Sequence, residues 1–183
     1  MPETFFTADL HLFHANILEL EPVNRAFSSI DEMHQTIIAN WNKDVRPSDT
    51  VFVLGDVMFH DRGLEILRQL NGTKKLVRGN HDEKFSNALF SECFSQVTCY
   101  RRIHHCLLSH IPVHPCQLSE RFVANIHGHM HSKRVLTEGG NIDPRYINVS
   151  MEQWNMTPVA WSDIEPQVRI LRELQQEQLA RGD

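Results

Sequence analysis

Five short apolar runs in this sequence each end in side chains that can bind a metal ion or carry a proton. The residues that follow the runs are, in chain order, Asp9-Leu10-His11, Gly55-Asp56, Gly79-Asn80-His81-Asp82, His110 and His127-Gly128-His129-Met130-His131. In open α/β sheets, ligands bind outside the carboxyl ends of the strands. Five strand ends that meet at one edge would gather these side chains around one point, so we expect an α/β fold with a single polar site.

The pattern of apolar residues supports this fold class. The expected strands are Thr4–Ala8, Thr50–Leu54, 75–77, 96–101, 104–109, 122–126 and 145–149, and the expected helices cover about 30–43, the leucines from Leu64 to Leu70, and about 163–180. The spacing of Ser29 and Glu32 is that of a helix-capping box. The first half thus reads βαβαβ and the second half is rich in strands, which favours an α/β protein with a mixed sheet, or two sheets, flanked by helices. At 183 residues and without a linker-like stretch, we expect one domain over residues 1–183.

Composition narrows the function. The chain has 12 His against 2 Tyr and 3 Trp. Imidazole is the commonest metal ligand and titrates near neutral pH, so metal or acid–base chemistry is the first function to test. The net charge of −5 makes a long nucleic acid an unexpected partner, because such binding usually needs a basic face.

Neither a membrane nor a secreted location is expected. The longest apolar runs fall far short of the ~20 residues that a membrane helix needs. The start of the sequence lacks the pattern of a signal peptide, and the four cysteines contain no C-x-x-C pair. We expect reduced, mostly buried thiols in a cytoplasmic protein; the sequence leaves open whether it forms a homo-oligomer.

The spacing of the polar residues suggests chelation. In extended chain, residues i and i+2 project to the same side, so Asp9 with His11, and His129 with His131, can each offer two ligands to one ion. Gly128 lets the backbone turn close to the site. Mixed imidazole and carboxylate ligands favour Mn²⁺, Fe, Co²⁺, Ni²⁺ or Zn²⁺ over Mg²⁺ or Ca²⁺.

The order D-x-H, G-D, G-N-H-D, a lone His and G-H-x-H over residues 9–131 resembles the calcineurin-like metallophosphoesterases, in particular their small single-domain bacterial and phage-type members. The resemblance implies two packed mixed β-sheets flanked by helices, a four-layer α/β/β/α sandwich, with a two-metal centre at the strand ends. It implies two divalent metal ions, with Mn²⁺ as the expected metal and Fe, Ni²⁺, Co²⁺ or Zn²⁺ as alternatives.

Carried over residue by residue, the resemblance implies that Asp9, His11 and His131 hold one metal, that Asn80, His110 and His129 hold the other, and that Asp56 bridges them. His81 is then not a ligand but the catalytic residue, which acts as general acid to the leaving oxygen or stabilises charge there. The implied function is a metal-dependent phosphoesterase that hydrolyses a small phosphomonoester or phosphodiester, nucleotides and cyclic nucleotides included, by in-line attack of a metal-bridging hydroxide. The alternatives are a nuclease of the same superfamily and a non-catalytic scaffold that retains the fold.

Two further residues are candidates for substrate binding. His14 follows the first motif at the mouth of the expected site, and Arg78 precedes Gly79-Asn80; each is expected to contact a phosphate, or else to have an ordinary surface or ion-pairing role. The carboxylate that would keep His81 protonated is Asp82, the next residue, or another one.

Overall fold

The strands of the first half of the chain form one sheet. The computed structural model describes residues 1–118 and 121–181. The strands β4 (Gln96–Thr98), β3 (Thr73–Val77), β2 (Thr50–Val53) and β1 (Thr4–Thr7) lie side by side in that order and run parallel, and β9 (Val159–Ala160) pairs antiparallel with β1. Parallel strands need crossover connections; α2 (Ile30–Asp44) lies between β1 and β2, and α3 (Gly63–Leu67) between β2 and β3.

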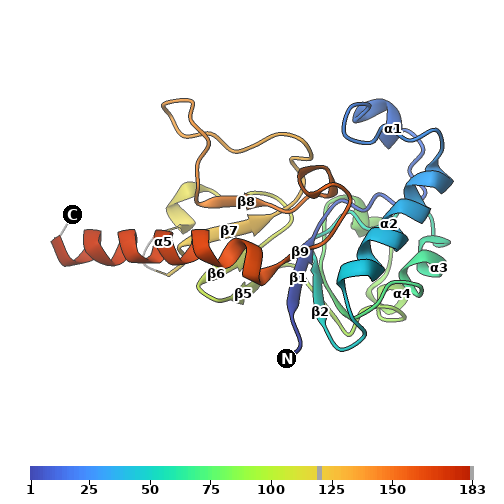
Figure 1. Cartoon of the computed structure of the whole chain (residues 1–183), viewed down its shortest axis with the longest axis horizontal. Coiled ribbons are helices and arrows are strands. Elements are labelled where there is room, and N and C mark those ends of the chain that lie inside the picture. Colours follow the sequence, from blue (N-terminus) through green and yellow to red (C-terminus); the bar gives the residue numbers. More distant parts are fainter. Residues whose placement is uncertain (119–120, 182–183) are drawn as a thin grey trace.

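The second half forms another sheet, which lies beside the first in Figure 1. Its order is β5 (Arg101–Ile103), β6 (Cys106–Leu108), β7 (Ala124–His127) and β8 (Tyr146–Asn148). The β5–β6 pair is antiparallel and the other two pairs are parallel, so both sheets are mixed. The remaining elements are α1 (Ile17–Leu20), α4 (Asn87–Phe90), α5 (Trp161–Arg181) and the 3₁₀ turns His81–Lys84, Pro115–Gln117 and Met151–Trp154. The predicted fold class, two packed mixed sheets with helices, is confirmed.

The two faces of the first sheet belong to different apolar clusters. Phe5 and Val51 face a cluster that includes the buried side chains of α2 and α3. Their neighbours Phe6 and Phe52 face the second sheet, in a cluster that also holds Ile164 and Val168 of α5. This alternation follows from the two-residue period of a strand, and it stacks helices, first sheet and second sheet in layers.

The helix α2 forms where the capping signal predicts it. The Ser29 hydroxyl accepts a hydrogen bond from the Glu32 backbone N–H at 3.1 Å, which satisfies one free donor of the first turn. The Glu32 carboxylate reaches back to the backbone N–H of Ser28, one residue earlier than in a standard capping box. The stripe Met33, Ile37 and Trp41 is fully buried.

Four details differ from the sequence-based expectation. The helix α3 ends at Leu67, and Leu70 lies beyond it, where its carbonyl accepts a hydrogen bond from Lys74 Nζ. The expected strand 96–101 is two strands in different sheets, because the chain leaves the first sheet after Thr98 and enters the second at Arg101.

The expected strand 104–109 is shorter, since His104 and His105 form the turn before β6. The cysteines are not mostly buried: Cys106 alone is, while Cys99 and Cys116 are exposed.

The C-terminal helix α5 is only partly covered. Its residues Ile164 and Val168 are buried, but Leu174 is 52% exposed, and the last turns extend past the sheets (Figure 1). Among the residues that the structure describes, no helix combines the length and apolar character needed to cross a bilayer.

Replacing Ile37 by Ala should lower the free energy of unfolding by about 2–5 kcal/mol, the usual cost of truncating a fully buried aliphatic side chain. Urea unfolding followed by circular dichroism measures this change. The matched control is Ile170→Ala on α5, where the side chain is 54% exposed and the change should stay within about 0.5 kcal/mol. Equal effects at the two positions would contradict the described packing of α2.

Candidate metal centre

The loops that follow the strands bring the predicted ligands together in an unusual backbone conformation. Asp9, His11, Asp56, His129 and His131 have φ angles of 59°, 49°, 53°, 69° and 50°. The left-handed region is uncommon for residues other than Gly, and residues held there cluster at functional sites. The side chains of Asp9 and His11, and those of His129 and His131, therefore lie close together as expected. The backbone of both residues in each pair is left-handed, however, and not extended as the sequence suggested.

Two glycines allow the loops to approach one another closely. A Cβ atom on Gly128 would lie 2.7 Å from Asp9 Oδ2, and one on Gly79 would lie 2.6 Å from the backbone nitrogen of Asp56. Both distances are too short for a side chain. The expected role of Gly128 is thus confirmed, and any larger residue at either position would push the ligand loops apart.

The first group of donors consists of Asp9, His11 and His131, whose ligand atoms all lie within 4.8 Å of one another. Asp9 and His11 follow β1 of the first sheet, while His131 follows β7 of the second. His11 Nδ1 and His14 Nδ1 share a hydrogen bond of 2.9 Å; with the proton on His11, its Nε2 presents a lone pair. Asp9 Oδ1 and His11 Nε2 are buried and have no hydrogen-bond partner in the described residues.

The second group consists of Asp56, His110 and His129, again within 4.8 Å. His110 Nδ1 donates to the Leu54 carbonyl at 2.8 Å, which directs Nε2 toward the cluster. That Nε2 lies 3.0 Å from Asn80 Oδ1, so the amide predicted as a ligand belongs to the same cluster. This group also joins the two sheets, since Asp56 follows β2 and His110 follows β6.

Asp56 lies between the two groups. Its Oδ2 is 3.8 Å from His11 Nε2 and 3.3 Å from His110 Nε2, and its Oδ1 accepts the backbone N–H of His81 at 2.9 Å. The carboxylate is 1% exposed. One oxygen within reach of both groups is the arrangement that a bridging carboxylate requires.

The electrostatics of the cluster suit a cation. Burial opposes ionisation of Asp9, but the neighbouring imidazoles of His11, His110 and His131 outweigh it and lower the pKa of the Asp9 carboxyl. Burial likewise disfavours a charged His110, yet Asp56 and Asp9 raise the pKa of His110 to about 9. The two carboxylates thus draw positive charge to this point.

These observations fit divalent metal ions. A buried polar atom normally has a partner. Five buried side-chain atoms lack one among the described residues, and two of them, Asp9 Oδ1 and His11 Nε2, belong to predicted ligands of one group. The donor set of imidazole nitrogens and carboxylate oxygens is that of a transition-metal site. The structure therefore brings together all seven predicted ligands in two adjacent groups.

Two functional residues were missed by the sequence analysis. Glu152 Oε1 accepts hydrogen bonds from His131 Nδ1 at 2.8 Å and from Arg25 Nε at 2.6 Å. Arg25 is fully buried and also donates to the backbone carbonyls of Asp9 and Leu10. A metal-binding His usually has its second nitrogen fixed in this way. Glu152 follows the end of strand β8, and this position could have marked it as a candidate in the sequence. The sequence around Arg25 has no pattern that would indicate its role.

Of the carboxylates that the sequence left open as partners of His81, Asp82 is directed toward the backbone. Its buried carboxylate accepts the backbone N–H groups of Asp56, Val57 and Gly79 at 2.8–3.0 Å. Asp82 therefore shapes the loop that carries Asp56. The carboxylate nearest to the His81 ring is Asp56, with Oδ2 3.9 Å from Nε2, and the His81 side chain is 48% exposed at the edge of the site.

The two predicted substrate contacts have other partners. His14 stacks on Phe59 with the ring centroids 3.7 Å apart; burial and neighbouring His11 lower its pKa to about 4, so it is uncharged at neutral pH. The Arg78 guanidinium donates to Asn87 Oδ1 at 2.6 Å and to the carbonyls of Asp82 and Phe85. It holds the segment after His81 in place, and a phosphate contact of either residue stays a prediction.

Comparison with known proteins agrees with this geometry. The calcineurin-like phosphoesterase family matches the chain over residues 4–179. The chain is 36% identical to the uncharacterized protein MJ1445 of Methanocaldococcus jannaschii over 87% of this chain and 88% of that protein, and 28% identical to the gene 66 protein of Mycobacterium phage L5 over 84% and 88%. A solved structure, the protein of unknown function AQ665 from Aquifex aeolicus, is similar with a TM-score of 0.73 at 28% identity over 91% of this chain and 99% of that chain.

Replacing Glu152 by Gln should weaken Mn²⁺ binding roughly 10- to 100-fold, the usual effect of removing the partner of a metal-binding His. Isothermal titration calorimetry of the metal-free protein measures the affinity. The matched control Glu92→Gln removes a carboxylate that pairs with Arg68 at the surface, and should leave the affinity unchanged. An unaltered affinity in Glu152→Gln would show that His131 needs no such support.

Proposed function

The chain belongs to the calcineurin-like phosphoesterase family of metal-dependent phosphoesterases, and we propose that it hydrolyses a small phosphate ester at a centre of two divalent metal ions. The observation that carries this proposal is the position of Asp56, whose Oδ2 lies within 4 Å of His11 in one donor group and of His110 in the other. The proposal includes the single domain and the cytoplasmic location predicted from the sequence.

In this proposal, Asp9, His11 and His131 hold one ion, Asn80, His110 and His129 hold the other, and Asp56 bridges them. Mn²⁺ is the metal proposed. Two such ions, when bound, neutralise charge on the phosphoryl oxygens and lower the pKa of water, which supplies the nucleophile. The supporting residues keep the donors in place: His14 fixes His11, the Leu54 carbonyl fixes His110, and Glu152 fixes His131.

His81 is proposed to assist the leaving group. Its backbone N–H is anchored to Asp56 Oδ1, while its half-exposed imidazole stands at the edge of the cluster. The ring also packs near Phe59, at 4.9 Å between centroids. An imidazole held there can donate a proton to the oxygen that departs from phosphorus. The ammonium of Lys84, 4.1 Å from the Phe59 ring centroid, adds positive charge at the same edge.

The space beside the centre supports a small substrate. A hollow of about 330 Å³ is lined by Asn80 and His110 of the second donor group together with Cys99 and Ile111. This volume lies at the lower end of the range for small-molecule sites. We propose that the organic part of the ester lies there while the phosphate faces the donors, and that a nucleotide or cyclic nucleotide has suitable dimensions.

Hydrolysis of p-nitrophenyl phosphate and bis(p-nitrophenyl) phosphate should require Mn²⁺, stop on chelation and resume when Mn²⁺ is restored. Asp56→Asn should abolish turnover because both donor groups lose the shared oxygen. The control His114→Ala, which removes an exposed imidazole outside the cluster, should retain full activity. Absence of metal-dependent turnover of both esters would refute the enzymatic proposal.

The role of His81 has its own test. His81→Ala should lower kcat about 10²–10⁴-fold for an alkyl phosphate ester, whose leaving oxygen needs a proton. The loss should be much smaller for a p-nitrophenyl ester, because nitrophenolate departs unprotonated. Steady-state kinetics with the two leaving groups measures the difference, and equal losses would argue against proton donation by His81.

A further inference from the structure

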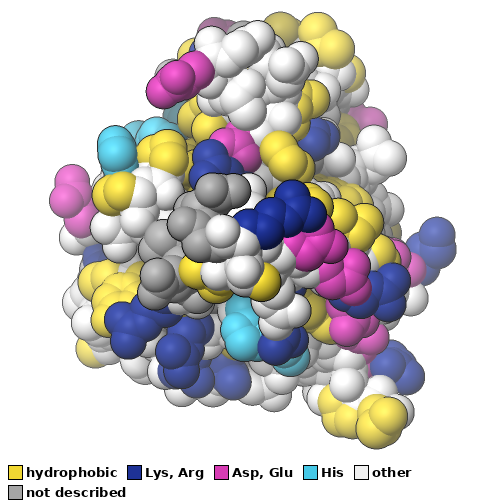
Figure 2. Space-filling model, turned by 90° about the vertical axis from the view of Figure 1, so that its left-hand side faces the viewer, with side chains coloured by type: hydrophobic (Ala, Val, Ile, Leu, Met, Phe, Trp, Pro, Cys, Tyr) yellow, Lys and Arg dark blue, Asp and Glu magenta, His cyan; other side chains and the backbone are white. Residues whose placement is uncertain are grey.

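A basic face lies at the opposite end of the second sheet from the metal centre. It consists of Arg102, Arg121, Arg169 and Arg172, all exposed. Arg102 lies on the edge strand β5, Arg121 precedes β7, and Arg169 and Arg172 are one turn apart on α5. On the side of the molecule shown in Figure 2, several Lys and Arg side chains in dark blue lie together at the lower left, with a His side chain in cyan beside them near the bottom.

The guanidinium groups of this basic face have no ion-pair partner among the described residues. Within residues 1–118 and 121–181, no carboxylate lies within 4 Å of any of the four, although other arginines such as Arg25, Arg46 and Arg68 are paired. In a chain with a net charge of −5, four exposed cations on one face, with no ion-pair partner in the described residues, create a local positive potential. Such a potential attracts an anionic partner.

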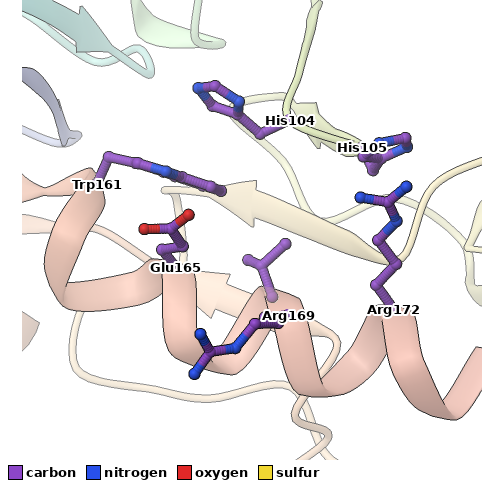
Figure 3. A pocket seen from close by; sticks show the side chains of 7 residues that line it. His104, His105, Trp161, Glu165, Arg169 and Arg172 are labelled. Atoms are coloured by element: carbon purple, nitrogen blue, oxygen red, sulfur yellow. The ribbon is translucent and has the colours of Figure 1, made fainter.

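Two adjacent hollows make the basic face concave. One, of about 310 Å³, is lined by Trp161, Arg169 and Arg172 together with His104 and His105 (Figure 3). The other, of about 320 Å³, is lined by Arg102, Arg121 and the same two histidines. Because the hollows share His104 and His105, they form one continuous surface with cations at both ends.

Aromatic rings stand between the cations. The rings of His104 and Trp161 stack with centroids 4.4 Å apart and an interplanar angle of 25°. In Figure 3 the His105 ring lies above the Arg172 guanidinium, on the other side of the hollow. The carboxylate lining these hollows, Glu165, lies beside Trp161, where it can accept hydrogen bonds from amino or hydroxyl groups.

The turn that presents the two histidines is conformationally costly. Ile103 pairs with Cys106, so His104 and His105 are the whole of a two-residue hairpin turn, with φ angles of 47° and 64°. Asn-Gly or Gly-Gly is the usual choice when both central residues have positive φ. Two histidines in this turn lower the stability of the fold relative to Asn-Gly. This cost is consistent with a binding role for their exposed rings.

We propose that the basic face binds a single-stranded segment of nucleic acid. Single strands are bound by grooves that combine cations for the phosphates with aromatic side chains on which bases stack, and both elements are present. An acidic protein segment would use the cations but not the stacked rings. The net charge of −5, which made a long nucleic acid an unexpected partner, does not reveal this face, because the fold assembles it from three separate segments.

This binding is independent of the proposed hydrolysis. His104 and His105 precede β6, whereas His110 follows its other end, so the basic face and the metal centre lie at opposite ends of the strand. Variants of the basic face should therefore leave Mn²⁺-dependent hydrolysis of p-nitrophenyl esters unchanged. Loss of nucleic-acid binding and loss of the hydrolytic activity can thus be observed separately.

Fluorescence anisotropy with labelled oligo-dT and oligo-U of about 12 nucleotides tests the proposal. We expect dissociation constants of roughly 10⁻⁶–10⁻⁴ M near physiological salt. Arg102→Ala with Arg169→Ala should weaken binding at least tenfold and reduce the slope of log K against log salt by about 1.4, since each phosphate contact on a single strand contributes about 0.7. The two oligonucleotides distinguish DNA from RNA.

The control removes equal charge elsewhere. Lys43→Ala with Arg68→Ala changes two cations on α2 and at the end of α3, and should leave the affinity and the salt slope unchanged. Stacking has a separate readout: oligonucleotide binding should quench tryptophan fluorescence, and Trp161→Phe, which keeps a ring against Phe6, should remove most of the quenching.

Three results would overturn the proposal. One is the absence of oligonucleotide binding at concentrations up to roughly 10⁻⁴ M, the weak limit for electrostatic binding. Another is equal weakening by the control pair, which would indicate attraction to general surface charge. The third is tighter binding of a labelled poly-glutamate peptide of the same charge, which would assign the basic face to an acidic protein.

Discussion

The buried guanidinium of Arg25 fixes the geometry on which the metal centre depends. A fully buried cation is stable only when its charge and its donors are compensated, and Arg25 finds this in Glu152 and in the carbonyls of Asp9 and Leu10. The same Glu152 oxygen holds His131. One side chain thereby sets the loop after β1, the turn after β8 and the imidazole after β7, which are distant in sequence and meet at one point.

The sequence was sufficient to predict the fold class and the cluster of ligands, because both depend on residues at strand ends. The reasoning for Asp9 and His11 was nevertheless wrong in detail: the pair converges through left-handed backbone, not through an extended chain. Arg25 and Glu152 could not be assigned, since an arginine in a loop and a glutamate after a strand gain meaning only from contacts that span 127 positions. The sequence left open which carboxylate faces His81, because adjacency in sequence does not give the direction of a side chain; the Asp82 carboxylate binds backbone N–H groups instead.

The division of the segment 96–103 shows another limit of sequence patterns. Residues 96–98 and 101–103 both look like strand, and no local property indicates that they belong to different sheets. The same limit applies to charge. A net charge of −5 describes the whole chain, whereas carboxylates such as Asp9, Asp56 and Glu152 are buried around the metal centre and exposed arginines lie at the far end of the second sheet.

Both donor groups take ligands from both sheets, with Asp9, His11 and Asp56 on the first and His110, His129 and His131 on the second. An ion in either group would therefore act as a cross-link between the two layers of the sandwich. Sliding of one sheet along the other would stretch every such cross-link at once. Binding of metal ions would therefore make the sandwich stiffer. The apolar layer between the sheets in turn helps to set the distances between the ligand atoms of the two sheets.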